Sequence, residues 1–109
     1  MVTAELAAAL PALALVMMAA IWVIGLTSIQ LQCSDAAREA ARAAARGESI
    51  QTVRDIARTV APRQAEVEIE WGDNMVKIEI RASLRAPAPL GAALSPTVSG
   101  HAIALEERP

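Results

Sequence analysis

The sequence predicts an α+β protein with a long N-terminal hydrophobic helix, a short second helix and a small three-stranded antiparallel sheet. Residues 6–34 contain no Asp, Glu, Lys or Arg, and strong helix formers continue well beyond them. Apolar and charged residues then alternate over 65–71 and 75–85, which is typical of strands with one buried face. We therefore divide the chain into a helix over residues 1–46 and a small α+β domain over residues 49–109.

The first part of the chain is predicted to be one nearly continuous helix. About 20 apolar residues span a bilayer, so the apolar stretch of about residues 6–30 is long enough to cross a membrane. Pro11 removes a backbone donor, and we expect it to bend or loosen the helix around residues 7–11. At about 1.5 Å per residue the helix would be about 70 Å long. Its second half must then project beyond the membrane, and Gly47 is a natural C-cap for it.

The small domain is predicted to begin with a short helix. Ser49 is a suitable N-cap, and Pro62 sets the end of the helix at about Val60. Apolar residues recur in it at spacings of three and four, which indicates one buried face. The residues of this face are Ile50, Val53, Ile56, Ala57 and Val60. A domain of this size is marginal by itself, so we expect it to lean on the long helix or on partner chains.

The two alternating stretches predict a β-hairpin that closes over Asp73 and Asn74, because Gly72 and these residues favour a turn. A slip of one residue would mix the apolar and charged faces, so the register is well specified. The inner pairs are Trp71 with Val76, Ile69 with Ile78 and Val67 with Ile80. The outer pairs are Glu70 with Lys77, Glu66 with Arg81 and the unfavourable Glu68 with Glu79.

A loop and a weaker third strand complete the predicted domain. Residues 86–97 contain three prolines and Gly91, which favours a loop. Residues 98–106 are expected to form the third strand, with Ile103 and Leu105 on its inner face.

Composition argues against several function classes. The net charge is -2, and the chain has two Trp but no Phe or Tyr, so we expect no nucleic-acid partner. The chain offers no nucleophile–base pair, no glycine-rich phosphate loop and no metal-ligand spacing, so we expect no enzymatic activity and no cofactor. The single Cys33 is expected to be a buried, inert thiol, with an intermolecular disulfide as the alternative. Trp22 fits either an interfacial anchor or simple packing.

Glu5 is the charged residue that the long helix has to accommodate. An ionised carboxylate in an apolar membrane helix costs about 2.5–3.5 kcal/mol on insertion scales. One interpretation places Glu5 at the membrane interface, where the helix N-terminus and water stabilise it. The other pairs it with a cation in an assembled state, and a neighbouring subunit's α-amino group is the obvious partner.

The start of the chain, Met1-Val-Thr-Ala-Glu5 followed by Leu6-Ala-Ala-Ala-Leu10-Pro11, resembles that of a processed type IV pilin-like subunit. The later segment Asp35-Ala-Ala-Arg38-Glu39-Ala-Ala-Arg42 is similar to the TadE-like minor pilins of the tight-adherence (Tad/Flp) pilus system. This resemblance covers about residues 1–46. It implies that Met1 is the N-terminus left by a prepilin peptidase and that Glu5 forms a salt bridge to a neighbouring N-terminal amine. It also implies a pilin-like fold.

Small residues at helical spacing indicate helix packing, because they let helices approach closely; plain helix propensity is the alternative. In a pilin-like assembly these alanines would lie in the filament core or against the major pilin, and replacing Ala40 and Ala41 with Leu should disturb incorporation. The packing residues are Ala8, Ala12, Ala36, Ala40, Ala44, Ala37, Ala41 and Ala45.

The resemblance implies a structural minor pilin that contributes to pilus assembly and adhesion. Its partners would be a major Flp-type pilin, a second TadE-like protein, the prepilin peptidase and inner-membrane lipid. The chain would lie in the cytoplasmic membrane before assembly and in an extracytoplasmic pilus or on the cell surface afterwards. Arg38, Arg42 and Arg46 by themselves favour a cytoplasmic C-terminal side, which opposes this orientation. The alternative is a single-pass membrane protein with a small extracytoplasmic binding domain, unrelated to pili.

Overall fold

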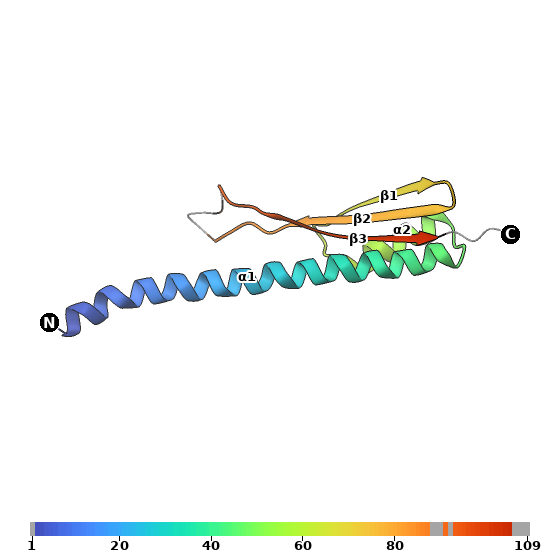
Figure 1. The fold of residues 1–109 in the computed structure, drawn as a ribbon. Helices are drawn as coiled ribbons and strands as arrows, with labels where there is room; N and C mark the ends of the chain where they lie inside the picture. Colours follow the sequence, from blue (N-terminus) through green and yellow to red (C-terminus); the bar gives the residue numbers. More distant parts are fainter. Residues whose placement is uncertain (1, 88–90, 92, 106–109) are drawn as a thin grey trace.

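The computed structural model describes residues 2–87, 91 and 93–105. Its elements follow in the order α1 (Val2–Ala45), α2 (Ile50–Val60), β1 (Glu66–Gly72), β2 (Met75–Ser83) and β3 (Thr97–Leu105). The predicted α+β class is therefore confirmed. Figure 1 shows α1 running along the whole molecule, whose longest dimension is 78 Å, with the sheet and α2 on the C-terminal half of this helix.

Helix α1 is unbroken through Pro11, and Figure 1 shows a gentle bend toward its N-terminal end. The helix ends at Ala45, and the chain turns away from it at Gly47, which has a φ of 83°. The amide of Gly47 donates to the carbonyl of Ala44 at 3.0 Å, and the amide of Glu48 donates to that of Ala43 at 3.2 Å. Glycine adopts this left-handed conformation without a Cβ clash, so the predicted C-cap is confirmed.

Helix α2 begins as predicted after Ser49, whose hydroxyl accepts the amide of Thr52 at 3.3 Å. Val53 and Ala57 are fully buried, and Ile56 packs against the core. The buried face is shorter than predicted, because Ile50 and Val60 at the two ends are 46% and 37% exposed.

The sheet has the order β1-β2-β3, and both strand pairs are antiparallel. Every predicted pair of the β1–β2 hairpin is present, including Glu68 opposite Glu79. Arg81 relieves this like-charge contact, because its guanidinium lies 2.9 Å from the carboxylate of Glu68 and 3.9 Å from that of Glu79. Arg81 thus pairs diagonally across the outer face as well as lying opposite Glu66 in the register.

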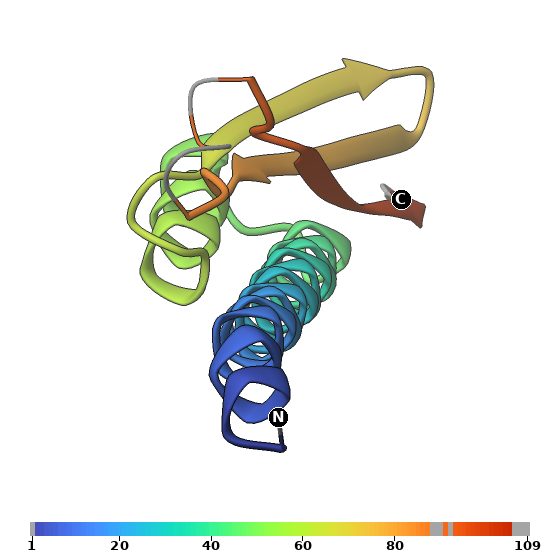
Figure 2. The same cartoon turned by 90° about the vertical axis from the view of Figure 1, so that its left-hand side faces the viewer.

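Both helices cover the same face of the sheet, as Figure 2 shows. The large buried side chains are Val53 of α2 and Val76, Ile78 and Ile80 of β2. The part of the core that α1 supplies consists of small residues, which are Cys33, Ala36, Ala37, Ala40, Ala41, Ala43 and Ala44. The globular part therefore includes the last third of α1, which agrees with the expectation that the small domain leans on the long helix.

The inner face of β3 differs from the prediction. Ile103 and Leu105 are 56% and 68% exposed on the outer side, so their assignment to the inner face was wrong. Gly100, Ala102 and Ala104 face inward instead, in register with the buried positions of β2. The reason is the closeness of α1: a Cβ on Gly100 would lie 2.5 Å from the carbonyl carbon of Cys33. Only small residues fit between β3 and the helix at this separation.

Candidate membrane and assembly segment

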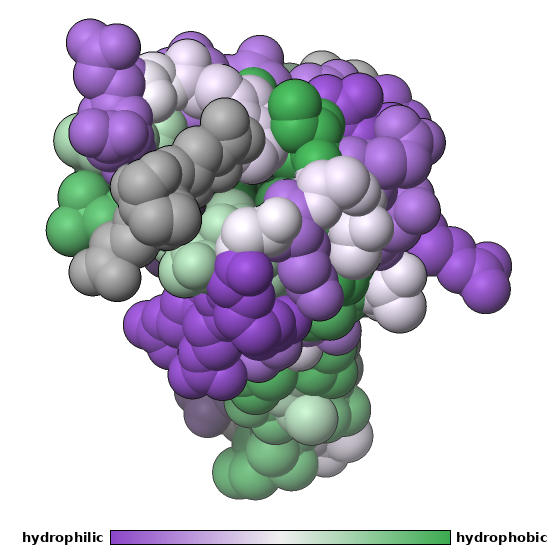
Figure 3. Space-filling view, turned by 90° about the vertical axis from the view of Figure 1, so that its right-hand side faces the viewer, coloured by the Kyte–Doolittle hydropathy of each residue, from purple (hydrophilic) through white to green (hydrophobic). Residues whose placement is uncertain are grey.

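The N-terminal two thirds of α1 extend beyond the domain with their apolar side chains uncovered. Among the described residues, α1 is the helix that is long and apolar enough to cross a membrane. In Figure 3 hydrophilic residues cover the end of the domain nearest the viewer, and the helix extending behind it is hydrophobic. The large apolar side chains of this segment that are exposed are Val2, Leu6, Leu10, Leu13, Leu15, Val16, Met17, Met18, Ile21, Val23, Ile24 and Leu31.

Glu5 lies in the first turn of α1 and is exposed. A carboxylate in this position is stabilised by the unpaired amides and the dipole at a helix N-terminus. Met1, whose amine belongs to the predicted processed N-terminus, lies outside the described residues. Ala8, Pro11 and Ala12 are exposed on the same segment, so they are available for contact with lipid or with another helix.

The later alanine rows have a different environment from Ala8 and Ala12. Ala36, Ala37, Ala40, Ala41 and Ala44 are at most 9% exposed, because the sheet and α2 of the same chain cover them. Their assignment to contacts with other subunits is therefore corrected: they pack within the chain.

Ala45 is exposed, and Ala43 takes its place in the buried row. The spacing of the alanines correctly indicated close packing, but it did not say whether the partner was the same chain or another one.

The described residues of the loop between β2 and β3, which are 84–87, 91 and 93–96, include a contact with α1 that the sequence did not predict. A side-chain carbon of Leu84 lies 3.5 Å from the position that a Cβ on Gly25 would occupy. Pro87 and Trp22 line the same apolar hollow. The indole nitrogen of Trp22 is buried and has no hydrogen-bond partner among the described residues. Trp22 therefore packs under this loop, and its packing interpretation is favoured over that of a freely exposed anchor.

Cys33 is fully buried where β3 crosses α1, and its thiol is free. Burial raises the pKa of the Cys33 thiol by desolvating the thiolate. A buried thiol is a poor nucleophile when only a small fraction of it is ionised to the thiolate. The buried environment thus agrees with the predicted inert thiol.

We expect Cys33 to react with a water-soluble disulfide reagent about 100-fold more slowly in the native chain than in denaturant. An opening free energy of about 3 kcal/mol would produce this factor. The raised pKa also means that the unfolded chain loses the thiol proton first as pH rises. The free energy of unfolding should therefore fall above about pH 8.5. Equal reaction rates in the two states would contradict the buried position.

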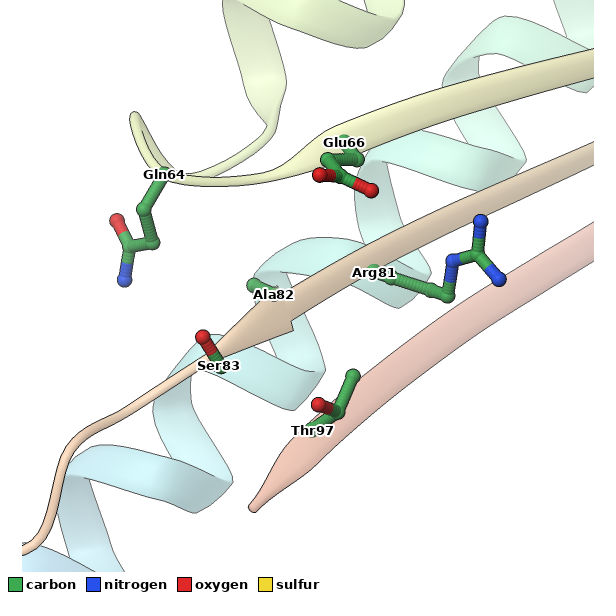
Figure 4. Close-up of a pocket in the computed structure, with 6 residues that line it drawn as sticks. All are labelled: Gln64, Glu66, Arg81, Ala82, Ser83 and Thr97. Atoms are coloured by element: carbon green, nitrogen blue, oxygen red, sulfur yellow. The ribbon is translucent and has the colours of Figure 1, made fainter. Parts of the chain in front are cut away.

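A polar hollow of about 340 Å³ lies at the end of the sheet where β2 stops. Figure 4 shows that its lining side chains come from β1, β2 and β3 and the segment before β1. Its charged residues are Glu66 and Arg81, and the guanidinium of Arg81 is paired with Glu68 and Glu79. Among the described residues, no three His, Cys, Asp or Glu side chains gather to hold a metal ion.

No known protein-family profile matches the chain, and no solved structure matches it. The chain is similar to a protein of Mycobacterium tuberculosis named Apoptosis inhibitor Rv3655c, with 40% identity over 78 residues. The similarity covers 72% of this chain and 62% of that protein. The chain therefore spans less than two thirds of the length of this relative.

Proposed function

We propose that the chain is a structural, pilin-like subunit, a TadE-like minor pilin of a Tad (Flp) type IV pilus that contributes to pilus assembly and adhesion. The observation that carries this proposal is the division of α1. Its first two thirds are apolar, exposed and marked by one carboxylate at Glu5, while its last third forms the base of a small domain. A subunit of this shape is held by lipid before assembly and by neighbouring helices afterwards.

The exposed segment supplies the driving force for both states. Twelve large apolar side chains of α1 are exposed in the isolated chain, and burying each fully is worth about 1.5–3 kcal/mol. Lipid and a bundle of helices are both apolar, so exchanging one for the other costs little. The chain therefore passes from the cytoplasmic membrane into a filament without exposing this surface to water.

Glu5 sets the position of this helix along a neighbouring helix in the assembled state. A carboxylate near the N-terminus of an otherwise uncharged segment gains most by meeting a cation. An α-amino group of a neighbouring subunit is the proposed partner, since it lies at the same end of an identical or similar helix. The proposed partners are the major Flp-type pilin and a second TadE-like protein, and a prepilin peptidase is the proposed processing enzyme.

Replacing Glu5 with glutamine should reduce the amount of this chain in pili about tenfold while leaving it in the membrane fraction. The loss corresponds to about 1.4 kcal/mol, close to the value of one hydrogen bond to a charged group. Glu39→Gln is the matched control, because Glu39 forms an exposed pair with Arg42 at 3.1 Å, and such pairs contribute little. Equal incorporation of the two variants would argue against the salt bridge.

The proposed location is tested by shearing pili from cells and probing the purified filaments for this chain. We expect to find it there at a low ratio to the major pilin. A chain confined to the membrane fraction of piliated cells would refute the pilus assignment.

The second candidate is a single-pass membrane protein with a small extracytoplasmic binding domain, unrelated to pili. The similarity to a protein named Apoptosis inhibitor Rv3655c favours this candidate, because that name refers to apoptosis and not to a pilus. It predicts that cells displaying this chain suppress apoptosis in infected host cells even when pilus assembly is abolished. Dependence of that effect on intact pili would favour the pilin.

A further inference from the structure

We propose that the described residues of the β2–β3 loop, 84–87 and 93–96, form a second membrane contact, inserted into the interfacial layer of the leaflet from which α1 emerges. The occupant of this surface is lipid. The inference rests on the membrane-spanning role of α1 proposed above and adds a second point at which the domain is held.

The loop follows α1 back toward its N-terminus. Leu84 lies at the level of Gly25, where its side chain comes within 3.5 Å of the position that a Cβ on this glycine would occupy. Farther along the loop, Pro87 shares an apolar hollow with Met18 and Trp22. Figure 1 shows the described parts of the loop extending from the sheet over the N-terminal half of α1. Any membrane that surrounds this half of the helix therefore also reaches the loop.

The depth of the loop follows from the helix rise. With Glu5 at the opposite interface, Met18 lies 13 residues farther along the chain, or about 20 Å. Trp22 lies 17 residues from Glu5, or about 26 Å. The hydrocarbon core is about 30 Å thick, so Pro87 lies roughly 4–10 Å below its outer boundary. Interfacial segments insert to about 5–10 Å.

The loop has the composition and the backbone hydrogen bonds that insertion to this depth in the membrane requires. No charged residue occurs from Ala86 to Gly100, and Leu94 is 44% exposed. The loop also pairs its own polar groups, since the amide of Ala86 donates to the carbonyl of Leu94 at 3.0 Å and the amide of Leu84 donates to that of Pro96 at 3.3 Å. Backbone that satisfies itself enters a lipid environment at lower cost.

The end of the sheet that lies farthest from the loop is polar. The β1–β2 turn contains Asp73 and Asn74, which are exposed and polar. Arg85 is exposed close to the level of Gly25, about 30 Å from Glu5 by the helix rise. Lipid phosphates lie near that level and attract arginine. The uncharged part of the loop, from residue 86 onward, therefore faces the membrane, while Arg85 lies at the level of the lipid headgroups and the polar β1–β2 turn faces water.

The test places a nitroxide label on a single introduced cysteine in the full chain, in vesicles of phosphatidylcholine and phosphatidylglycerol. Leu94→Cys reports on the loop, Leu13→Cys on the spanning helix and Asp73→Cys on the distant turn. Native Cys33 is fully buried, and the parent chain shows whether it stays unlabelled. The measurement is the ratio of collisions with oxygen to collisions with a water-soluble nickel complex, which rises with depth in lipid.

We expect the ratio at Leu94 to exceed that at Asp73 several-fold and to approach that at Leu13. A water-like ratio at Leu94 with a lipid-like ratio at Leu13 would overturn the loop contact and leave the anchor intact. A water-like ratio at Leu13 would overturn the anchor itself. Shielding of Leu94 from both reagents would place another copy of the chain on the loop and would also overturn the lipid contact.

Discussion

Replacing Gly100 with alanine is expected to lower the free energy of unfolding by about 3 kcal/mol or more, near the upper end of overpacking effects. The added Cβ would lie 2.5 Å from the carbonyl carbon of Cys33 and 2.5 Å from the amide nitrogen of Ser34. Both are backbone atoms of α1, so no side-chain rotation relieves the contact. Strand β3 must move away from the helix, which opens the alanine-lined core.

The matched control is Gly72→Ala. A Cβ there would meet its nearest neighbour, the carbonyl oxygen of Met75, at an ordinary 3.9 Å. This substitution removes backbone freedom from the unfolded chain, so it should be neutral or stabilising by up to about 1 kcal/mol. Urea unfolding of both variants in detergent micelles, followed by tryptophan fluorescence, provides the comparison. Equal stability of the two variants would show that β3 does not lie against the backbone of α1.

The β1–β2 hairpin was predictable down to its register because each residue type there has one clear position. Glu66, Glu68 and Glu70 alternate with apolar residues, and the turn residues fix the pairing. The same reasoning failed at β3. Ile103 and Leu105 are more hydrophobic than the alanines beside them, but the separation of β3 from α1 decides which side chains fit. That separation is a tertiary property.

The candidate site was predictable in part for a similar reason. The length and lack of charge of the apolar segment marked it as a surface in need of lipid or other helices, and Glu5 stood out within it. The return of the β2–β3 loop along α1 was not predicted. Its signal was the absence of charge from Ala86 to Gly100, which is easily missed because an irregular loop has no hydrophobic period.

Replacing Ala40 with leucine should destabilise the domain by about 2–3 kcal/mol. Ala40 is fully buried in the core between α1 and the elements that cover it. Leucine adds three carbon atoms to a site with no room for them, and overpacking of this kind costs roughly 1–3 kcal/mol. Urea unfolding gives the loss of stability, and the amount of chain retained in the membrane fraction tests whether α1 is still inserted.

Ala45→Leu is the matched control, because Ala45 lies on the same helix and is exposed. Its helix propensity changes little, so its stability should stay within about 0.5 kcal/mol of the parent. The pair of variants also separates two explanations of any defect in pilus incorporation. If Ala40→Leu lowers incorporation in proportion to its loss of stability, the alanine rows act through the fold of their own chain. Lowered incorporation at unchanged stability would instead restore the direct contact with another subunit, and would contradict the burial of Ala40.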